Sequence, residues 1–129
     1  MMKEKKKTLV LGASDNPARY SYLAIQRLRS LGHPVLAIGR KNTTLGDVTI
    51  TKDVTLTKEN KEFTGIDTIT LYLNQQHQRE YYDYILSLQP RRIIFNPGAE
   101  NAELASLATK NGIQALEACT LVLLSTNQY

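Results

Sequence analysis

Gly12-Ala-Ser-Asp-Asn-Pro-Ala-Arg19 is the stretch of sequence that decides the fold. It follows an apolar run at residues 8–11 and leads into residues 20–31, where apolar side chains recur at helical spacing. A strand, a loop and a helix in this order place backbone N–H groups and the positive end of a helix dipole at the carboxyl edge of a sheet. The stretch therefore predicts a loop that binds phosphate or pyrophosphate.

This loop is not a dinucleotide fingerprint. The pattern G-x-G-x-x-G would need glycine at positions 14 and 17, where the chain has Ser14 and Pro17. We expect a nucleotide as the ligand, and NAD is not the first choice.

Beyond this loop, strand and helix patterns alternate along the chain. Strands are expected at 8–11, 35–38, 48–50, 68–73, 92–95 and 113–116, and helices at 20–31, 76–88, 101–111 and 120–124. A short helix or an irregular turn is expected after residue 57. This order is typical of an α/β protein with a Rossmann-like, doubly wound parallel sheet in a single domain.

Length and charge favour a single domain behind a basic tail. The chain has 129 residues and a net charge of +4, and lysine is concentrated at Lys3 and at residues 5–7. We expect a solvated basic tail over residues 1–7 and the folded domain over 8–129. Aromatic residues do not interleave with the lysines, so nucleic acid is not expected as a partner.

Hydropathy and cysteine content indicate the compartment. The sequence contains no run near the roughly 20 apolar residues that a membrane helix needs. The apolar segment after the basic tail is too short for a signal peptide, and the one cysteine fits a reducing environment. We therefore expect a cytoplasmic protein without a membrane partner.

Two cations follow the second expected strand. Parallel strands place the loops 12–19, 39–42, 73–76 and 96–100 at one edge, where ligands bind in such sheets. NAD-binding proteins have an acidic residue after the second strand, whereas this chain has Arg40 and Lys41. The cations suit a ligand with an extra phosphate on the adenosine ribose, either NADP or coenzyme A (CoA). A solvated Arg-Lys pair in a turn is the alternative.

Several motifs resemble a known family. They are Leu11-Gly-Ala-Ser-Asp-Asn-Pro-Ala-Arg-Tyr-Ser-Tyr22, Leu31-Gly-His-Pro-Val35, Ile38-Gly39, Thr70-Leu-Tyr-Leu-Asn74, Ile94-Phe-Asn-Pro-Gly-Ala-Glu100 and Glu117-Ala-Cys119. In order and spacing, they resemble the stand-alone CoA-binding domain family. That family is similar to the CoA-binding domain of the succinyl-CoA synthetase α subunit, which has a Rossmann-like fold.

The resemblance implies a set of site residues in four groups. Around the pyrophosphate it implies Gly12, Ala13, Ser14, Asn16, Arg19, Tyr20 and Ser21. Near the adenosine ribose and its phosphate it implies Gly39, Arg40 and Lys41, where many relatives instead carry Asn-Pro. Along the adenine or pantetheine path it implies Leu73 and Asn74, and in the opposite wall Asn96, Pro97 and Gly98.

Catalytic patterns are sparse. His33 is expected as a cap residue in a turn, and His77 as an exposed residue at the start of a helix near the crevice. No spacing of histidine and cysteine indicates a metal site. Cys119 is expected just past the last strand, either as a buried inert thiol or as a reactive thiol facing the end of the pantetheine arm.

We therefore expect non-catalytic binding of CoA or an acyl-CoA, as a carrier or regulatory module. A regulatory module would need an exposed apolar patch for a protein partner that the sequence does not identify. The alternative is an NADP-dependent oxidoreductase or a sugar-nucleotide enzyme. Against it, neither Tyr20 nor Tyr22 has a lysine at the offset that a Ser-Tyr-x-x-x-Lys set requires.

Overall fold

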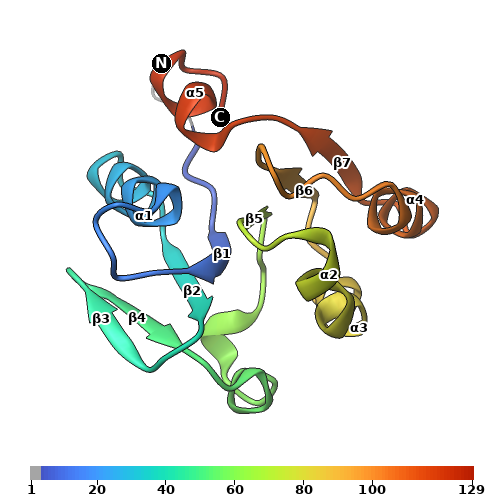
Figure 1. Ribbon diagram of the computed structural model, residues 1–129, viewed down its shortest axis with the longest axis horizontal. Coiled ribbons are helices and arrows are strands. Elements are labelled where there is room, and N and C mark those ends of the chain that lie inside the picture. Colours follow the sequence, from blue (N-terminus) through green and yellow to red (C-terminus); the bar gives the residue numbers. More distant parts are fainter. Residues whose placement is uncertain (1–3) are drawn as a thin grey trace.

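The computed structural model describes residues 4–129 and contains a seven-stranded sheet (Figure 1). The strand order is β3-β4-β2-β1-β5-β6-β7. Neighbouring strands pair in parallel except β3, which is antiparallel to β4 at one edge. The strands are β1 (Thr8–Ala13), β2 (Val35–Gly39), β3 (Thr43–Leu45), β4 (Val48–Thr51), β5 (Thr68–Leu71), β6 (Arg92–Phe95) and β7 (Gln114–Glu117).

Helices cover both faces of the sheet, as in a doubly wound fold (Figure 1). One face carries α1 (Tyr20–Ser30) and α5 (Thr120–Ser125), which pack next to each other. The other face carries α2 (Gln75–Gln78), the 3₁₀ turn η3 (Arg79–Tyr81), α3 (Tyr82–Ser87) and α4 (Ala102–Lys110). The 3₁₀ turns η1 (Val54–Thr57) and η2 (Lys61–Phe63) connect β4 to β5.

The core consists of two apolar layers because alternate side chains of a strand point to opposite faces. Leu9 and Leu11 of β1 are fully buried in the layer under α3 and α4. Val10, between them, is fully buried in the layer under α1 and α5. The predicted Rossmann-like α/β fold is confirmed.

One predicted helix, over residues 76–88, is interrupted in the structure. Residues 76–88 do not form a single helix, because the 3₁₀ turn η3 separates α2 from α3. Tyr81, at the junction, has φ −104° and ψ 0°, outside ordinary helical geometry. Its side chain is half-buried and lines a pocket, whereas Tyr84 and Ile85 of α3 are buried in the core as their spacing predicts.

The polar segment after β2 contains a strand that the sequence did not predict. Thr43–Leu45 (β3) pairs with β4 across a two-residue turn, in which Gly46 adopts a φ of +60°. Its partly exposed threonines lack the apolar alternation that would have marked it as a strand.

Lys6 and Lys7, which the sequence places in the basic tail, contact the domain. The amide of Lys6 donates a hydrogen bond to Nδ1 of His33 at 2.9 Å, and Nζ of Lys7 donates to the carbonyl of Thr64 at 2.8 Å. The backbone carbonyl of Lys7 also accepts from the amides of Asp67 and Thr68. Lys3 lies outside the described residues.

Candidate functional site

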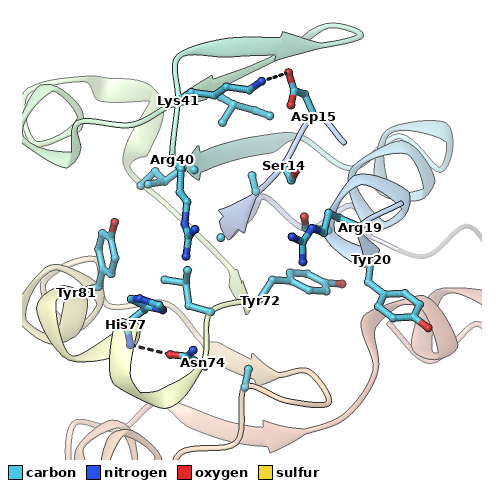
Figure 2. A pocket seen from close by; sticks show the side chains of 18 of the residues that line it. Ser14, Asp15, Arg19, Tyr20, Arg40, Lys41, Tyr72, Asn74, His77 and Tyr81 are labelled. Carbon is cyan, nitrogen blue, oxygen red and sulfur yellow. Dashed lines mark hydrogen bonds and ion pairs between the residues drawn. The ribbon is translucent and has the colours of Figure 1, made fainter. Parts of the chain in front are cut away.

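A pocket of about 690 Å³ lies at the carboxyl edge of the sheet, where β1, β2 and β5 end (Figure 2). β1 is the switch point, since β2 and β4 lie on one side of it and β5, β6 and β7 on the other. Ligands of open α/β sheets bind at this position. The lining residues are Gly12, Ala13, Ser14, Asp15, Arg19, Tyr20, Ser21, Ile38, Gly39, Arg40, Lys41, Thr43, Ile50, Tyr72, Leu73, Asn74, His77, Glu80, Tyr81, Pro97, Gly98 and Ala99.

The loop between β1 and α1 is fixed by its own hydrogen bonds. Ser14 Oγ accepts from the amide of Asn16 at 3.0 Å, and the Asn16 side chain accepts from the amide of Ala18 at 3.0 Å. Helix α1 begins after Arg19, whose side chain makes no capping hydrogen bond. Because Tyr20 and Ser21 line the pocket, the start of α1 borders it, and its dipole favours an anion there.

Gly39 brings the ends of β1 and β2 together. A Cβ atom on Gly39 would lie 2.3 Å from the carbonyl oxygen of Ala13 and 2.9 Å from the side chain of Ile50. Any larger residue would push the strand ends apart. The close approach also places Arg40 and Lys41, which follow Gly39, beside the loop between β1 and α1.

Two arginines extend into the pocket from opposite sides (Figure 2). Arg40 comes from the end of β2, and Arg19 comes from the start of α1 next to Tyr72. Within residues 4–129, neither guanidinium has a hydrogen-bond acceptor or an ion-pair partner. The pocket therefore offers unneutralised positive charge to an anionic ligand.

Lys41 is placed differently from Arg40. Its Nζ forms an ion pair with Oδ2 of Asp15 at 3.1 Å, and the same oxygen accepts from the Thr43 hydroxyl at 3.1 Å. The hydrogen bond from Lys41 is the largest cause that lowers the pKa of Asp15 below its ordinary value. Asp15 is therefore a carboxylate at neutral pH, and the pair joins the loops after β1 and β2.

The wall after β5 is held by a buried amide. Gln78 is fully buried, and its Nε2 donates to the carbonyls of Leu73 at 2.8 Å and Ala99 at 2.7 Å. Its Oε1 accepts from the side chain of Asn101 at 2.9 Å. Gln78 thus joins the loop after β5 to the loop after β6, and both loops line the pocket.

Tyr72 supplies an apolar surface beside Arg19. Burial is the largest cause that raises the pKa of Tyr72, to about 12. The phenol is therefore neutral at physiological pH, and the ring contributes a flat apolar wall next to a cation.

Most of the site residues predicted from the sequence come together in this pocket. The lining includes Gly12, Ala13, Ser14, Arg19, Tyr20, Ser21, Gly39, Arg40, Lys41, Leu73, Asn74, Pro97 and Gly98. Asn16, Asn96 and Cys119 lie outside the lining. Their assignment to a ligand stays a prediction.

The Asn96 side chain is held by hydrogen bonds inside the protein. It is 2% exposed, and its amide donates to Thr70 Oγ1 at 2.7 Å and to the carbonyl of Leu71 at 2.9 Å. Its oxygen accepts from the amide of Thr120 at 2.8 Å. These bonds join β5, β6 and the start of α5.

Cys119 immediately precedes α5, where it occupies the N-cap position, and is partly buried. The thiol lies outside the pocket lining, and both alternatives, an inert thiol and a reactive thiol facing the end of the pantetheine arm, stay predictions.

The two histidines lie at opposite edges of the sheet. His77 lines the pocket at the start of α2, where its amide donates to Asn74 Oδ1 at 3.0 Å. His33 lies in the turn before β2, at the amino edge, and is only 7% exposed. Burial lowers the pKa of His33, and the charges of nearby lysines add to this effect.

Sequence reasoning missed several pocket residues. Asp15 stands inside the loop singled out above, but its pairing with Lys41 depends on how β1 and β2 converge. Tyr72 continues past the end of β5, and Glu80 and Tyr81 lie on the 3₁₀ turn where a continuous helix was expected. The sequence signal that could have indicated the pairing was an acidic residue in one edge loop together with a lysine in the neighbouring loop.

Residues 4–129 contain neither a metal-binding cluster nor a membrane-spanning helix. No group of histidine, cysteine, aspartate and glutamate side chains is arranged to hold a metal ion. Nor does this part of the chain contain a helix with the length and apolar character needed to cross a membrane.

The sheet topology and the helices on both faces define a Rossmann-like α/β protein with a pocket at the carboxyl edge of its sheet. Residues 6–125 match the family model of the CoA binding domain. The chain therefore belongs to the CoA-binding domain family, as its motifs predicted. Comparison with curated proteins found no match.

Several solved structures share the fold of this chain. The chain is 45% identical to an uncharacterised protein of known crystal structure, with a TM-score of 0.90, and the match covers 98% of this chain and 100% of that one. A protein from Thermus thermophilus is 18% identical, with a TM-score of 0.80, over 96% of this chain and 91% of that one. A protein from Pyrococcus horikoshii OT3 is 18% identical, with a TM-score of 0.81, over 95% and 83%. The last two show the fold alone.

Proposed function

We propose that this protein binds CoA or an acyl-CoA in the edge pocket. The observation that carries the proposal is that the end of β1 at Gly12, the start of α1 and the unpaired guanidinium groups of Arg19 and Arg40 line one pocket. Backbone amides at a helix start suit a pyrophosphate, and guanidinium groups suit phosphate oxygens. Membership in the CoA-binding domain family points to the same ligand.

The distribution of charge in the pocket suggests an orientation. Arg40 and Lys41 follow β2, so the ribose phosphate is proposed at that side. The pyrophosphate then lies over residues 12–14 and the first turn of α1. Leu73, Pro97 and Ala99 form a less polar wall beyond β5 and β6, which suits the pantetheine arm.

We further propose that binding occurs without catalysis, in the cytoplasm, as a carrier or a regulatory module. A regulatory role requires a surface for a protein partner. Large apolar side chains are exposed at Tyr20 and Leu23 on α1 and at Val122 on α5.

NADP is the second candidate ligand. It is favoured by one observation, the cations Arg40 and Lys41 at the end of β2, which a ribose 2′-phosphate would also satisfy. An NADP-dependent oxidoreductase or a sugar-nucleotide enzyme would use this same position.

Thermal denaturation with CoA, acetyl-CoA, NADP, NAD and ATP tests the proposal. CoA at about 100 times its Kd is expected to stabilise the protein by roughly 2.7 kcal/mol. Arg19→Glu should abolish this shift, whereas Arg27→Glu makes the same charge change on an exposed part of α1 outside the pocket and should retain it. A shift with NADP or NAD but none with CoA would overturn the proposal.

A further inference from the structure

Lys41 is held at the rim of the pocket by Asp15. Figure 2 shows the Lys41 side chain directed away from the centre and toward the carboxylate. Thr43 donates to the same carboxylate oxygen, which fixes its position. The side chain of Asp15 is 30% exposed and that of Lys41 is 67% exposed, so the pair is accessible to an incoming anion.

Arg40 has the opposite arrangement. Its side chain extends into the centre of the pocket, between Tyr81 and the start of α1 (Figure 2). It lies near enough to Tyr81 for its charge to oppose the rise that burial causes in the pKa of that phenol. Within residues 4–129 no acidic group pairs with the Arg40 guanidinium.

Neighbouring cations on one loop therefore differ in availability. A phosphate that approached Lys41 would have to break its ion pair, and it would then meet the negative charge of Asp15. A phosphate that approached Arg40 would find all the donors of a planar guanidinium unoccupied, and two of these can bind its oxygens together.

We propose that Arg40 recognises the phosphate on the adenosine ribose, and that Asp15 determines this choice by holding Lys41 in an ion pair. This inference rests on the proposed function and assigns the specificity for the ribose phosphate to particular residues. The ligand class is an adenosine nucleotide with a phosphate monoester on its ribose, and Asp15 is the specificity-determining residue.

The experiment compares CoA with dephospho-CoA, which differs only by the missing ribose phosphate. Isothermal titration calorimetry gives the Kd of each ligand. The Kd of dephospho-CoA divided by the Kd of CoA is the ratio that measures recognition of that phosphate. The ratio is expected to fall roughly tenfold or more in Arg40→Ala, because a charge-assisted contact is lost. It should fall much less in Lys41→Ala. Arg27→Ala removes the same charge from an exposed site outside the pocket and should leave the ratio unchanged.

Asp15→Asn tests the second half of the proposal. The amide is neutral and releases Lys41, so the ratio should rise above that of the wild type. In the Asp15→Asn background, Lys41→Ala should then reduce the ratio more strongly than it does in the wild type. This difference is the coupling between the residues in a double-mutant cycle.

The outcomes separate this inference from the proposed function. A larger loss of ratio in Lys41→Ala than in Arg40→Ala overturns the assignment to Arg40. An unchanged ratio in Asp15→Asn overturns the role of Asp15. If the wild type binds CoA and dephospho-CoA equally, the inference fails while CoA binding stands. If CoA does not bind at all, both fail.

Discussion

Gly12 and Leu73 lie so close together across the ends of β1 and β5 that a side chain on Gly12 would overlap Leu73. A Cβ atom on Gly12 would be 3.1 Å from Leu73 Cγ and 3.0 Å from the carbonyl carbon of Tyr72, and the φ of Gly12 is +94°. The end of β1 therefore needs glycine at this position for two reasons, its conformation and the lack of space for a side chain.

Gly12→Ala should destabilise the protein more than a glycine replacement that adds only conformational strain. The left-handed conformation costs about 1–2 kcal/mol, and the overlap with the end of β5 adds roughly 1–3 kcal/mol. Gly112→Ala is the matched control, because Gly112 has a φ of +76° and nothing within 4 Å of the added atom. Equal losses of stability in urea unfolding of the two variants would contradict the overlap with the end of β5.

Gln78→Leu should loosen both walls of the pocket. The carbonyls of Leu73 and Ala99 would lose their donor, so we expect a loss of about 2–4 kcal/mol in the free energy of unfolding. CoA binding should weaken as well, since both loops line the pocket. Gln76→Leu changes an exposed glutamine of the same helix and should have little effect on either quantity. A folded Gln78→Leu protein with wild-type affinity for CoA would refute the role given to this amide.

Asn96→Ala should act on stability. Its removal leaves the amide of Thr120 and the carbonyl of Leu71 without their partner at a buried site, at a cost of about 2–4 kcal/mol. Asn111→Ala removes a side-chain hydrogen bond to the carbonyl of Leu107 from an exposed position and should cost about 1 kcal/mol or less. Urea unfolding of both variants measures the difference. Similar small losses would show that the Asn96 bonds are dispensable.

Stability should depend on pH through His33. Burial lowers the pKa of His33, and Lys5, Lys6 and Arg92 add positive charge around it. The unfolded chain therefore takes up a proton at a pH where the folded chain does not, so stability is full above the ordinary pKa of about 6.5 and falls as the pH drops through it. Protonation at Nδ1 would also remove the acceptor for the Lys6 amide.

Unfolding measured between about pH 7 and pH 5 checks this expectation. In His33→Asn, whose Oδ1 can accept the same hydrogen bond, the fall in stability over this range should be smaller. His77→Asn alters an exposed histidine and should keep the wild-type profile. A His33→Asn profile as steep as that of the wild type would assign the pH dependence to other groups.

Local sequence patterns determined the order of the elements and the edge where the site lies. Apolar runs bounded by glycine and proline mark buried strands, and Arg92–Phe95 was predicted with its exact bounds. Because parallel strands share a carboxyl edge, the loops at Gly12, Gly39, Leu73 and Pro97 could be assigned to one pocket without coordinates. The order of the elements follows from which residues of each segment are buried, and hydrophobic periodicity within that segment indicates this directly.

Only the tertiary structure decided which side chains face the pocket and which are already engaged. Asn96 turns inward because Thr70 and Thr120, distant in sequence, offer partners there. Lys41 is bound by Asp15 while Arg40 is left unpaired, because the close contact between the ends of β1 and β2 brings the carboxylate to one cation of the loop. The direction of a loop side chain depends on groups from separate segments, and periodicity within a single segment holds no information about them.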